Sequence, residues 1–184
     1  MIPEPPTLEN DRVLLSPLNI DNYPLLYHIA AEEKLVQYSP SDIKTPEALK
    51  RYVELALEKQ KGNSVIPFII FDKKTNQYAG STRFMNIDHI NKTLEIGSTW
   101  IGREFQGTGL NQQMKLLMLN YAFLNMDFEK VEFRIDERNV RSRKAVEKLG
   151  AKLEGILRKN VYLLEGYKRN TCCYGILREE WTRQ

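Results

Sequence analysis

Apolar side chains recur at two spacings along this chain, and segments of the two kinds alternate. A spacing of three to four residues predicts helices that bury one face, and short dense apolar runs predict strands. Helices are expected at residues 20–33, 45–59, 110–122 and 140–149, and strands at 12–16, 65–71, 78–87, 94–101, 130–135, 151–162 and 170–181. This order predicts an α/β (α+β) fold with a mixed sheet of about seven strands and four helices.

Residues at the predicted helix ends support these boundaries. Asn19 or Asp21 can cap the first helix, Thr45 with Pro46 begins the second, and Asn139 can cap the last. The buried stripe of the helix at 110–122 is expected to hold Leu110, Met114, Leu117, Met118, Tyr121 and Ala122. Its methionines are interpreted as core filling, because Met packs readily into irregular gaps.

The turn between the strand at 94–101 and the following helix contains two glycines one residue apart, Gly107 and Gly109. A helix start carries unpaired N–H groups and the positive end of the helix dipole, and glycine lets a ligand approach the backbone closely. This strand–turn–helix unit therefore predicts a phosphate or pyrophosphate site. The P-loop string is absent, and Gln112 stands where the dinucleotide fingerprint needs its third glycine. An ordinary turn without a ligand remains the alternative on these residues alone.

A second motif runs from Asn139 to Ala151 with the pattern N-x-x-S-x-x-A-x-x-x-x-G-A. It resembles the element that follows the fifth strand of the GNAT acetyltransferases. Gln106-Gly107-Thr108-Gly109-Leu110-Asn111 resembles their coenzyme A loop, Q/R-x-x-G-x-G/A, and departs from it at Asn111. Residues 11–18, 155–158 and 174–181 resemble the first strand and the closing hairpin of the RimJ/RimL-like branch, so the resemblance spans nearly the whole chain.

The resemblance implies one GNAT domain over residues 1–184, with a sheet splayed between its fourth and fifth strands. It implies acetyl-CoA as cosubstrate, with the pantetheine arm in that gap. The residues that it assigns to coenzyme binding are Trp100, Ile101, Gln106, Gly107, Thr108, Gly109, Leu110, Asn111, Asn139, Ser142 and Arg143. Ordinary sheet packing is the alternative for the side chains of Trp100 and Ile101. A solvated surface position is the alternative for Gln106 and for Arg143.

Two of the side chains are candidate catalytic residues by the same resemblance. Glu95, on the strand that leads into the loop, would act as a general base through a water molecule. Ser142 would protonate or hydrogen-bond the leaving thiolate, a role that tyrosine often fills in other branches. A salt-bridged strand residue and a solvent-facing serine are the respective alternatives.

The implied activity is transfer of an acetyl group from acetyl-CoA to a primary amine by direct attack on the thioester. The acceptor would be a protein N-terminus, as on a ribosomal protein, or a small amine, and residues 35–44 and 162–169 would line its pocket. A GNAT fold that binds acyl-CoA or docks on a partner without turnover is the alternative class. The sequence leaves open the acceptor, the identity of the base, other acyl groups, and the choice between monomer and homodimer.

Composition narrows the cellular setting and the ligand classes. The net charge of +3 suits an anionic cofactor and is too small to indicate stable nucleic-acid binding. No apolar run is long enough to cross a membrane and residues 1–6 do not resemble a signal peptide, so a cytoplasmic location is expected. Cys172 and Cys173 are adjacent, which favours reduced thiols, and the two distant histidines, His28 and His89, indicate no metal site.

Overall fold

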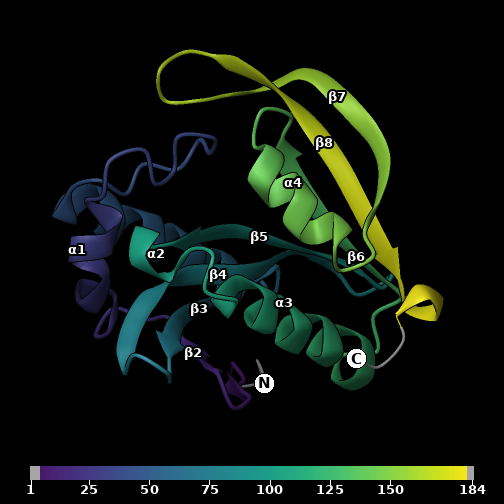
Figure 1. The fold of residues 1–184 in the computed structure, drawn as a ribbon, viewed down its shortest axis with the longest axis horizontal. Coiled ribbons are helices and arrows are strands. Elements are labelled where there is room, and N and C mark those ends of the chain that lie inside the picture. Colours follow the sequence, from purple (N-terminus) through teal and green to yellow (C-terminus); the bar gives the residue numbers. More distant parts are fainter. Residues whose placement is uncertain (1–4, 182–184) are drawn as a thin grey trace.

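The computed structural model describes residues 5–181 as one sheet with helices on both faces (Figure 1). The strands are β1 (Leu8–Glu9), β2 (Val13–Pro17), β3 (Val65–Asp72), β4 (Gln77–Asp88), β5 (Thr93–Ile101), β6 (Lys130–Asp136), β7 (Lys152–Tyr162) and β8 (Lys168–Leu177). They pair in the order β1-β2-β3-β4-β5-β6-β8-β7, antiparallel except for β5 with β6. The predicted mixed sheet is confirmed, and the two-residue β1 adds an eighth strand to the expected seven.

The helices are α1 (Tyr27–Ala30), α2 (Pro46–Lys61), α3 (Leu110–Asn120) and α4 (Val140–Glu147). Thr45 caps α2 as predicted, because its side chain accepts the N–H of Ala48 at 3.2 Å. The prediction of one helix over 20–33 is wrong in extent: a 3₁₀ turn, Tyr23–Leu26, precedes a four-residue α1. Pro24 lacks an N–H, and Asn19 draws the N–H groups of Asp21 and Asn22 into a turn, so a regular helix does not begin there.

Two further elements, α3 and β8, differ slightly from the prediction. The stripe of α3 buries Leu119 rather than Leu117, and after Asn120 the helix widens into a π-turn, Tyr121–Asn125. The strand expected over 170–181 ends at Leu177, where a 3₁₀ turn, Arg178–Glu180, begins. These differences lie away from the Gly-rich turn and do not move it.

Neighbouring residues of β4 show which helix covers which face of the sheet. The Thr82 hydroxyl contacts the Met118 sulfur of α3, whereas the Arg83 guanidinium lies 4.3 Å from the Tyr52 ring centroid of α2. Successive strand residues point to opposite faces, so α2 and α3 cover opposite sides. Figure 1 shows α4 in front of β6, which it contacts, on the inner side of the curved β7–β8 hairpin.

The sheet opens between β5 and β6, the fourth and fifth strands counted from β2. Their parallel pairing covers only Thr93 with Lys130, Leu94 with Val131 and Glu95 with Glu132. Beyond that point β5 continues to Ile101 and β6 to Asp136 without pairing to one another. The predicted splay is therefore confirmed, and it leaves two open strand edges that face each other across a gap.

A β-bulge lies on the open part of β5. Ser81 of β4 is opposite Trp100 and Arg83 is opposite Gly97, so Ser98 and Thr99 together stand opposite Thr82 alone. Ser98 has a φ of 46°, in the left-handed region that non-glycine residues seldom adopt. Bulges of this kind redirect main-chain groups and are common next to active sites.

Candidate active site

A groove of about 730 Å³ follows the gap between β5 and β6. Its walls are the two open strand edges, the N-terminal half of α3, one face of α4, and the loop that contains Tyr38. Of the predicted site residues, the groove brings together Glu95, Trp100, Ile101, Gln106, Gly107, Gly109, Asn111, Asn139 and Ser142. Thr108, Leu110 and Arg143 do not line it.

The Gly-rich turn has the geometry of an anion site. Gly107 and Gly109 have φ of 77° and 88°, and Gly109 directly precedes the first turn of α3. Within the described chain, the N–H groups of Gly107, Gly109 and Asn111 donate to no protein acceptor. The N–H of Gln106 is already used, because it donates to the Arg103 carbonyl at 3.1 Å. Free N–H groups at a helix start favour a phosphate.

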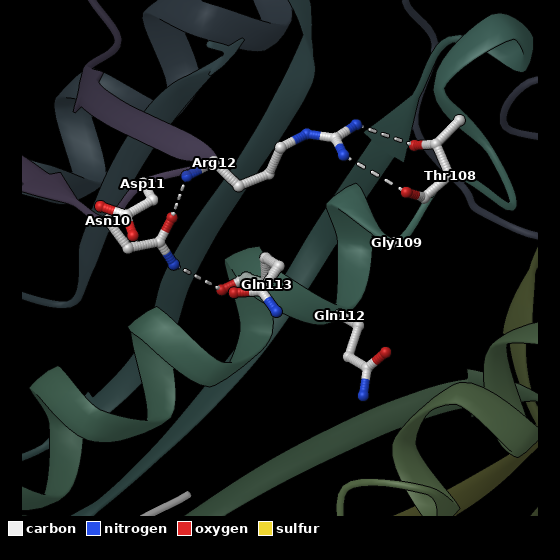
Figure 2. Close-up of a pocket in the computed structure, with 7 residues that line it drawn as sticks. All are labelled: Asn10, Asp11, Arg12, Thr108, Gly109, Gln112 and Gln113. Atoms are coloured by element: carbon white, nitrogen blue, oxygen red, sulfur yellow. Dashed lines mark hydrogen bonds between the residues drawn. The ribbon is translucent and has the colours of Figure 1, made fainter. Parts of the chain in front are cut away.

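Thr108 does not line the groove and is held instead by Arg12, the residue directly before β2 (Figure 2). The Arg12 guanidinium donates to the Thr108 hydroxyl at 3.2 Å and to its carbonyl at 3.4 Å. The same guanidinium makes a bidentate pair with Asp72, at 2.7 and 2.9 Å, and the Asp72 side chain is fully buried. A charge-assisted bidentate pair fixes direction as well as distance. Arg12 therefore holds the phosphate turn from behind.

The β5 end of the groove is ordered by Gln106. Its side-chain amide donates to the Ile101 carbonyl at 2.7 Å and accepts from Arg141 of α4. The Trp100 and Ile101 side chains are buried, and the Trp100 indole donates to the Tyr52 hydroxyl at 3.3 Å. The side chains of Trp100 and Ile101 therefore pack in the core, although both residues border the groove.

The start of α4 supplies polar groups to the opposite wall. The side-chain oxygen of Asn139 caps the helix by accepting the Ser142 N–H at 3.2 Å, and within residues 5–181 the Asn139 NH₂ group donates to no protein acceptor. Asn139 also borders the groove. The Ser142 hydroxyl has no protein partner within residues 5–181 and also borders the groove. Arg143 instead donates to the Tyr174 hydroxyl and to the Glu137 carbonyl, so its contacts fasten α4 to the sheet.

Glu95 lies at the vertex where β5 and β6 part. Its side chain accepts from the Asn86 amide at 2.8 Å, and Arg134 approaches the same oxygen at 3.7 Å. Burial is the main influence and raises the pKa of Glu95, while the Asn86 hydrogen bond and the Arg134 charge oppose that rise. A buried carboxylate whose pKa is raised toward neutrality is suited to accept a proton.

Two arginine side chains, Arg134 and Arg169, lie near Glu95 on the same face of the sheet. Arg169 of β8 is 9% exposed, and it donates to the Tyr38 carbonyl at 2.8 Å and to Thr171. This bond joins the two segments, 35–44 and 162–169, that were expected to line the acceptor pocket. Burial is the main influence on Arg169 and lowers its pKa. Arg134 is the second cation, so the Glu95 carboxylate lies near two guanidinium groups.

Sequence reasoning missed Lys115 and Arg169. Lys115 is 7% exposed, on the groove side of α3, although it follows a buried methionine in an apolar helix. The signal for it was its position four residues after Asn111, which places both on one helix face. No local signal identifies Arg169, because its neighbours come from a loop more than a hundred residues away.

The sequence also predicts no membrane-spanning segment, no metal site and no signal peptide. No helix within residues 5–181 is long and apolar enough to cross a membrane. Across the same residues, no group of three potential side-chain ligands is placed to hold a metal ion. Residues 1–4, on which the signal-peptide expectation partly rests, lie outside the described part.

Comparison with known proteins agrees with this geometry. Residues 12–152 match the family model "Acetyltransferase (GNAT) domain". A Bacillus subtilis (strain 168) relative named "Putative ribosomal N-acetyltransferase YdaF" is 26% identical over 136 residues, which cover 74% of this chain and 68% of that protein.

Two solved structures have the same fold. A GCN5-related N-acetyltransferase from Brucella melitensis has a TM-score of 0.86 and 26% identity, over 98% of this chain and 82% of that one. Spermidine N-acetyltransferase from Vibrio cholerae, in complex with CoA and spermine, has a TM-score of 0.77 and 18% identity, over 93% and 98%. The free N–H groups of the turn and the open strand edges fit an anionic ligand with an amide-bearing arm. The chain belongs to the GNAT family of acetyl-CoA-dependent N-acetyltransferases.

Proposed function

We propose that this protein acetylates the α-amino group of a protein or peptide N-terminus. The observation that carries the proposal is the buried carboxylate of Glu95, which lies at the vertex of the groove near the cations Arg134 and Arg169. The ribosomal N-acetyltransferase named among the relatives supports the same acceptor class.

The charge around the vertex bears on the choice between an N-terminus and a polyamine. A polyamine carries several ammonium groups and needs several carboxylates, whereas two guanidinium groups repel it. Asp136, the other groove-lining carboxylate, is already paired with Arg138 at 2.8 Å. A peptide N-terminus brings one ammonium group and backbone carbonyls, and guanidinium groups donate hydrogen bonds to carbonyls. The arrangement therefore favours the peptide.

Different residues would then bind the coenzyme, stabilise the oxyanion and accept the proton. Gly107, Gly109 and Asn111 offer N–H groups to the pyrophosphate, and Asn139 offers its free amide to the arm. Main-chain N–H groups at the Ser98 bulge would stabilise the negative charge that develops on the thioester oxygen. Glu95 would take the proton of the attacking amine, directly or through water.

The acceptor class is tested by measuring the rate of thiol release from acetyl-CoA in the presence of each member of a panel of acceptor amines. The panel holds short peptides with free N-termini, the same peptides with blocked N-termini and a free lysine, and polyamines. We expect the free N-terminal peptides to give the largest kcat/KM. Preferential turnover of polyamines would contradict the proposal, and CoA binding without turnover of any acceptor would favour the non-catalytic alternative.

Gly109→Val tests the phosphate turn. A β-carbon at Gly109 would meet no atom within 4 Å, so the cost comes only from the left-handed φ of 88°. We expect CoA to bind at least about 10-fold more weakly, from strain of about 1–2 kcal/mol. Calorimetry measures this, with Gly155→Val as control, since that site is equally open and has no left-handed φ. Equal affinities in the two variants would show that the turn does not hold the coenzyme.

Glu95→Gln tests the proposed base. A peptide N-terminus has a pKa of about 7.7–8.0, so roughly a tenth of it is already neutral at pH 7. We therefore expect kcat to fall only about 10-fold. The rate of the variant should still rise with pH up to about 8, because deprotonation of the substrate amine remains.

The control is Glu132→Gln, since Glu132 pairs with Glu95 across the strands but does not line the groove. Rates are measured against pH with the best acceptor from the panel. An unchanged kcat throughout for Glu95→Gln would leave Glu95 as a structural residue of the sheet.

A further inference from the structure

Lys115 is a buried cation with no anionic partner. The residue is 7% exposed, and within residues 5–181 its side chain forms no ion pair and no hydrogen bond. Its ammonium group lies 5.3 Å from the centroid of the Phe133 ring, a weak compensation for lost hydration. An unpaired buried charge is costly, so such a residue usually marks a functional site.

Lys115 lies at the end of the groove where β5 and β6 part. Asn111, Gln112 and Lys115 are the α3 residues that line the groove, and Lys115 lies furthest along the helix from the phosphate turn. Its contact, Phe133, is the first β6 residue beyond the last pair with β5. Lys115 therefore reaches the closed end of the gap, opposite the end where the phosphate turn lies.

Lys115 and Glu95 face this gap from opposite sides of the sheet. Lys115 contacts Phe133, whereas Glu95 is 3.7 Å from Arg134, the next residue of β6. Because consecutive strand residues point to opposite faces, a group held in the gap has the carboxylate on one side and the ammonium on the other. An arm that starts at the phosphate turn and follows the open edge of β5 brings its reactive end to this point.

We propose that Lys115 is a catalytic residue of the acetyl transfer and protonates the sulfur of the departing thiolate. The inference rests on the proposed acetyltransferase reaction and deepens it. When the acceptor nitrogen bonds to the acetyl carbon, the carbon–sulfur bond breaks and its electron pair stays on sulfur. Lys115 gives that sulfur a proton and becomes a neutral amine. Glu95 takes the proton of the acceptor nitrogen and then releases it to solvent, and solvent returns one proton to Lys115, so the net transfer is from amine to thiol.

The acidity of Lys115 matches this role. Burial lowers its pKa to about 8, close to the value of about 8.5 for an ordinary thiol. A lysine with an unshifted pKa near 10.4 would hold its proton about 100-fold more tightly than the thiolate does. The Ser142 hydroxyl can donate a hydrogen bond but is far too weak an acid to lose a proton here. The charged groups that share the groove with Lys115 are Arg141 and Lys144 of α4, Lys148 directly after it, Glu95 of β5, Arg134 and Asp136 of β6, and Arg169 of β8.

The test compares Lys115→Met and Lys115→Arg with the wild type, and uses Lys59→Met, an exposed lysine of α2, as control. Both Lys115 variants should lose about 100-fold in kcat, because methionine has no proton to give and arginine does not release its own. Wild-type kcat should fall as pH rises past about 8, and this decline should disappear in Lys115→Met. Lys59→Met should match the wild type.

Bound CoA gives a readout that is independent of turnover. The thiolate absorbance of the bound thiol is titrated in the wild type and in Lys115→Met. An adjacent ammonium stabilises a thiolate, so the thiol pKa should be at least about one unit lower in the wild type. An equal thiol pKa with unchanged kcat would overturn the proposal, as would weaker CoA binding with kcat preserved. Failure of the wild type to bind CoA would instead refute the acetyltransferase assignment.

Discussion

Replacement of Asp72 by asparagine is expected to lower the free energy of unfolding by about 3 kcal/mol at pH 7. The Asp72 side chain is fully buried and accepts two hydrogen bonds from Arg12, at 2.7 and 2.9 Å, and one from the Lys74 N–H at 3.0 Å. Asparagine keeps the shape but removes the charge, so the Arg12 guanidinium loses its counterion. Removal of one partner from a buried pair costs far more than loss of a surface pair.

The effect should depend on pH in a defined direction. Burial alone would raise the pKa of Asp72, but hydrogen bonds from Arg12 and Lys74 and the charge of Arg12 lower it overall. A carboxylate with a lowered folded pKa stabilises the fold above its unfolded pKa of about 3.9 and loses that contribution as pH falls through the folded value. The difference between wild type and Asp72→Asn should therefore shrink on acidification below about pH 4.

Urea unfolding of both proteins measures the difference, with Asp127→Asn as control. Asp127 also binds an arginine, Arg178 at 2.7 Å, but its side chain is 66% exposed. The control should lose at most about 1 kcal/mol. If Asp72→Asn loses no more than Asp127→Asn, the Arg12–Asp72 pair is not a main support of the phosphate turn.

The parts of the site that the sequence predicts are those with local causes. A glycine at left-handed φ, an Asn cap and an amphipathic stripe each depend on a few neighbouring residues, so Gly109, Asn139 and most of α3 were correctly placed. The confirmed splay between β5 and β6 came from family resemblance, because no local pattern states where two strands stop pairing.

The parts that were missed depend on contacts between distant segments. Arg12 binds Thr108 across 96 positions, and Arg169 binds the Tyr38 carbonyl across 131. Thr108 and Arg143 were assigned to the coenzyme from their motifs, yet their contacts fasten the turn and α4 to the rest of the fold. A motif places a residue near a ligand, but the direction of its side chain follows from the packing around it.

Lys115→Met should raise the free energy of unfolding by about 3 kcal/mol at pH 7, even though it removes most of the activity. Burial lowers the pKa of Lys115 from 10.5 to about 8, and one pKa unit corresponds to about 1.4 kcal/mol. Below pH 8 both the folded and the unfolded chain carry the proton, so folding bears the full cost of burying it. Between about 8 and 10.5 only the unfolded chain carries it, and wild-type stability should rise with pH relative to the variant.

Urea unfolding of the wild type, Lys115→Met and Lys59→Met at several pH values tests this. The advantage of Lys115→Met should be largest near neutrality and should vanish as pH approaches 10.5, the unshifted value. Lys59→Met should show little change at any pH, because that side chain is exposed in both states. A variant less stable than the wild type, or a difference independent of pH, would mean that the ammonium group has a partner that stabilises its charge. A stability gain combined with a fall in kcat would show that the fold bears the cost of an unpaired buried charge for the sake of catalysis.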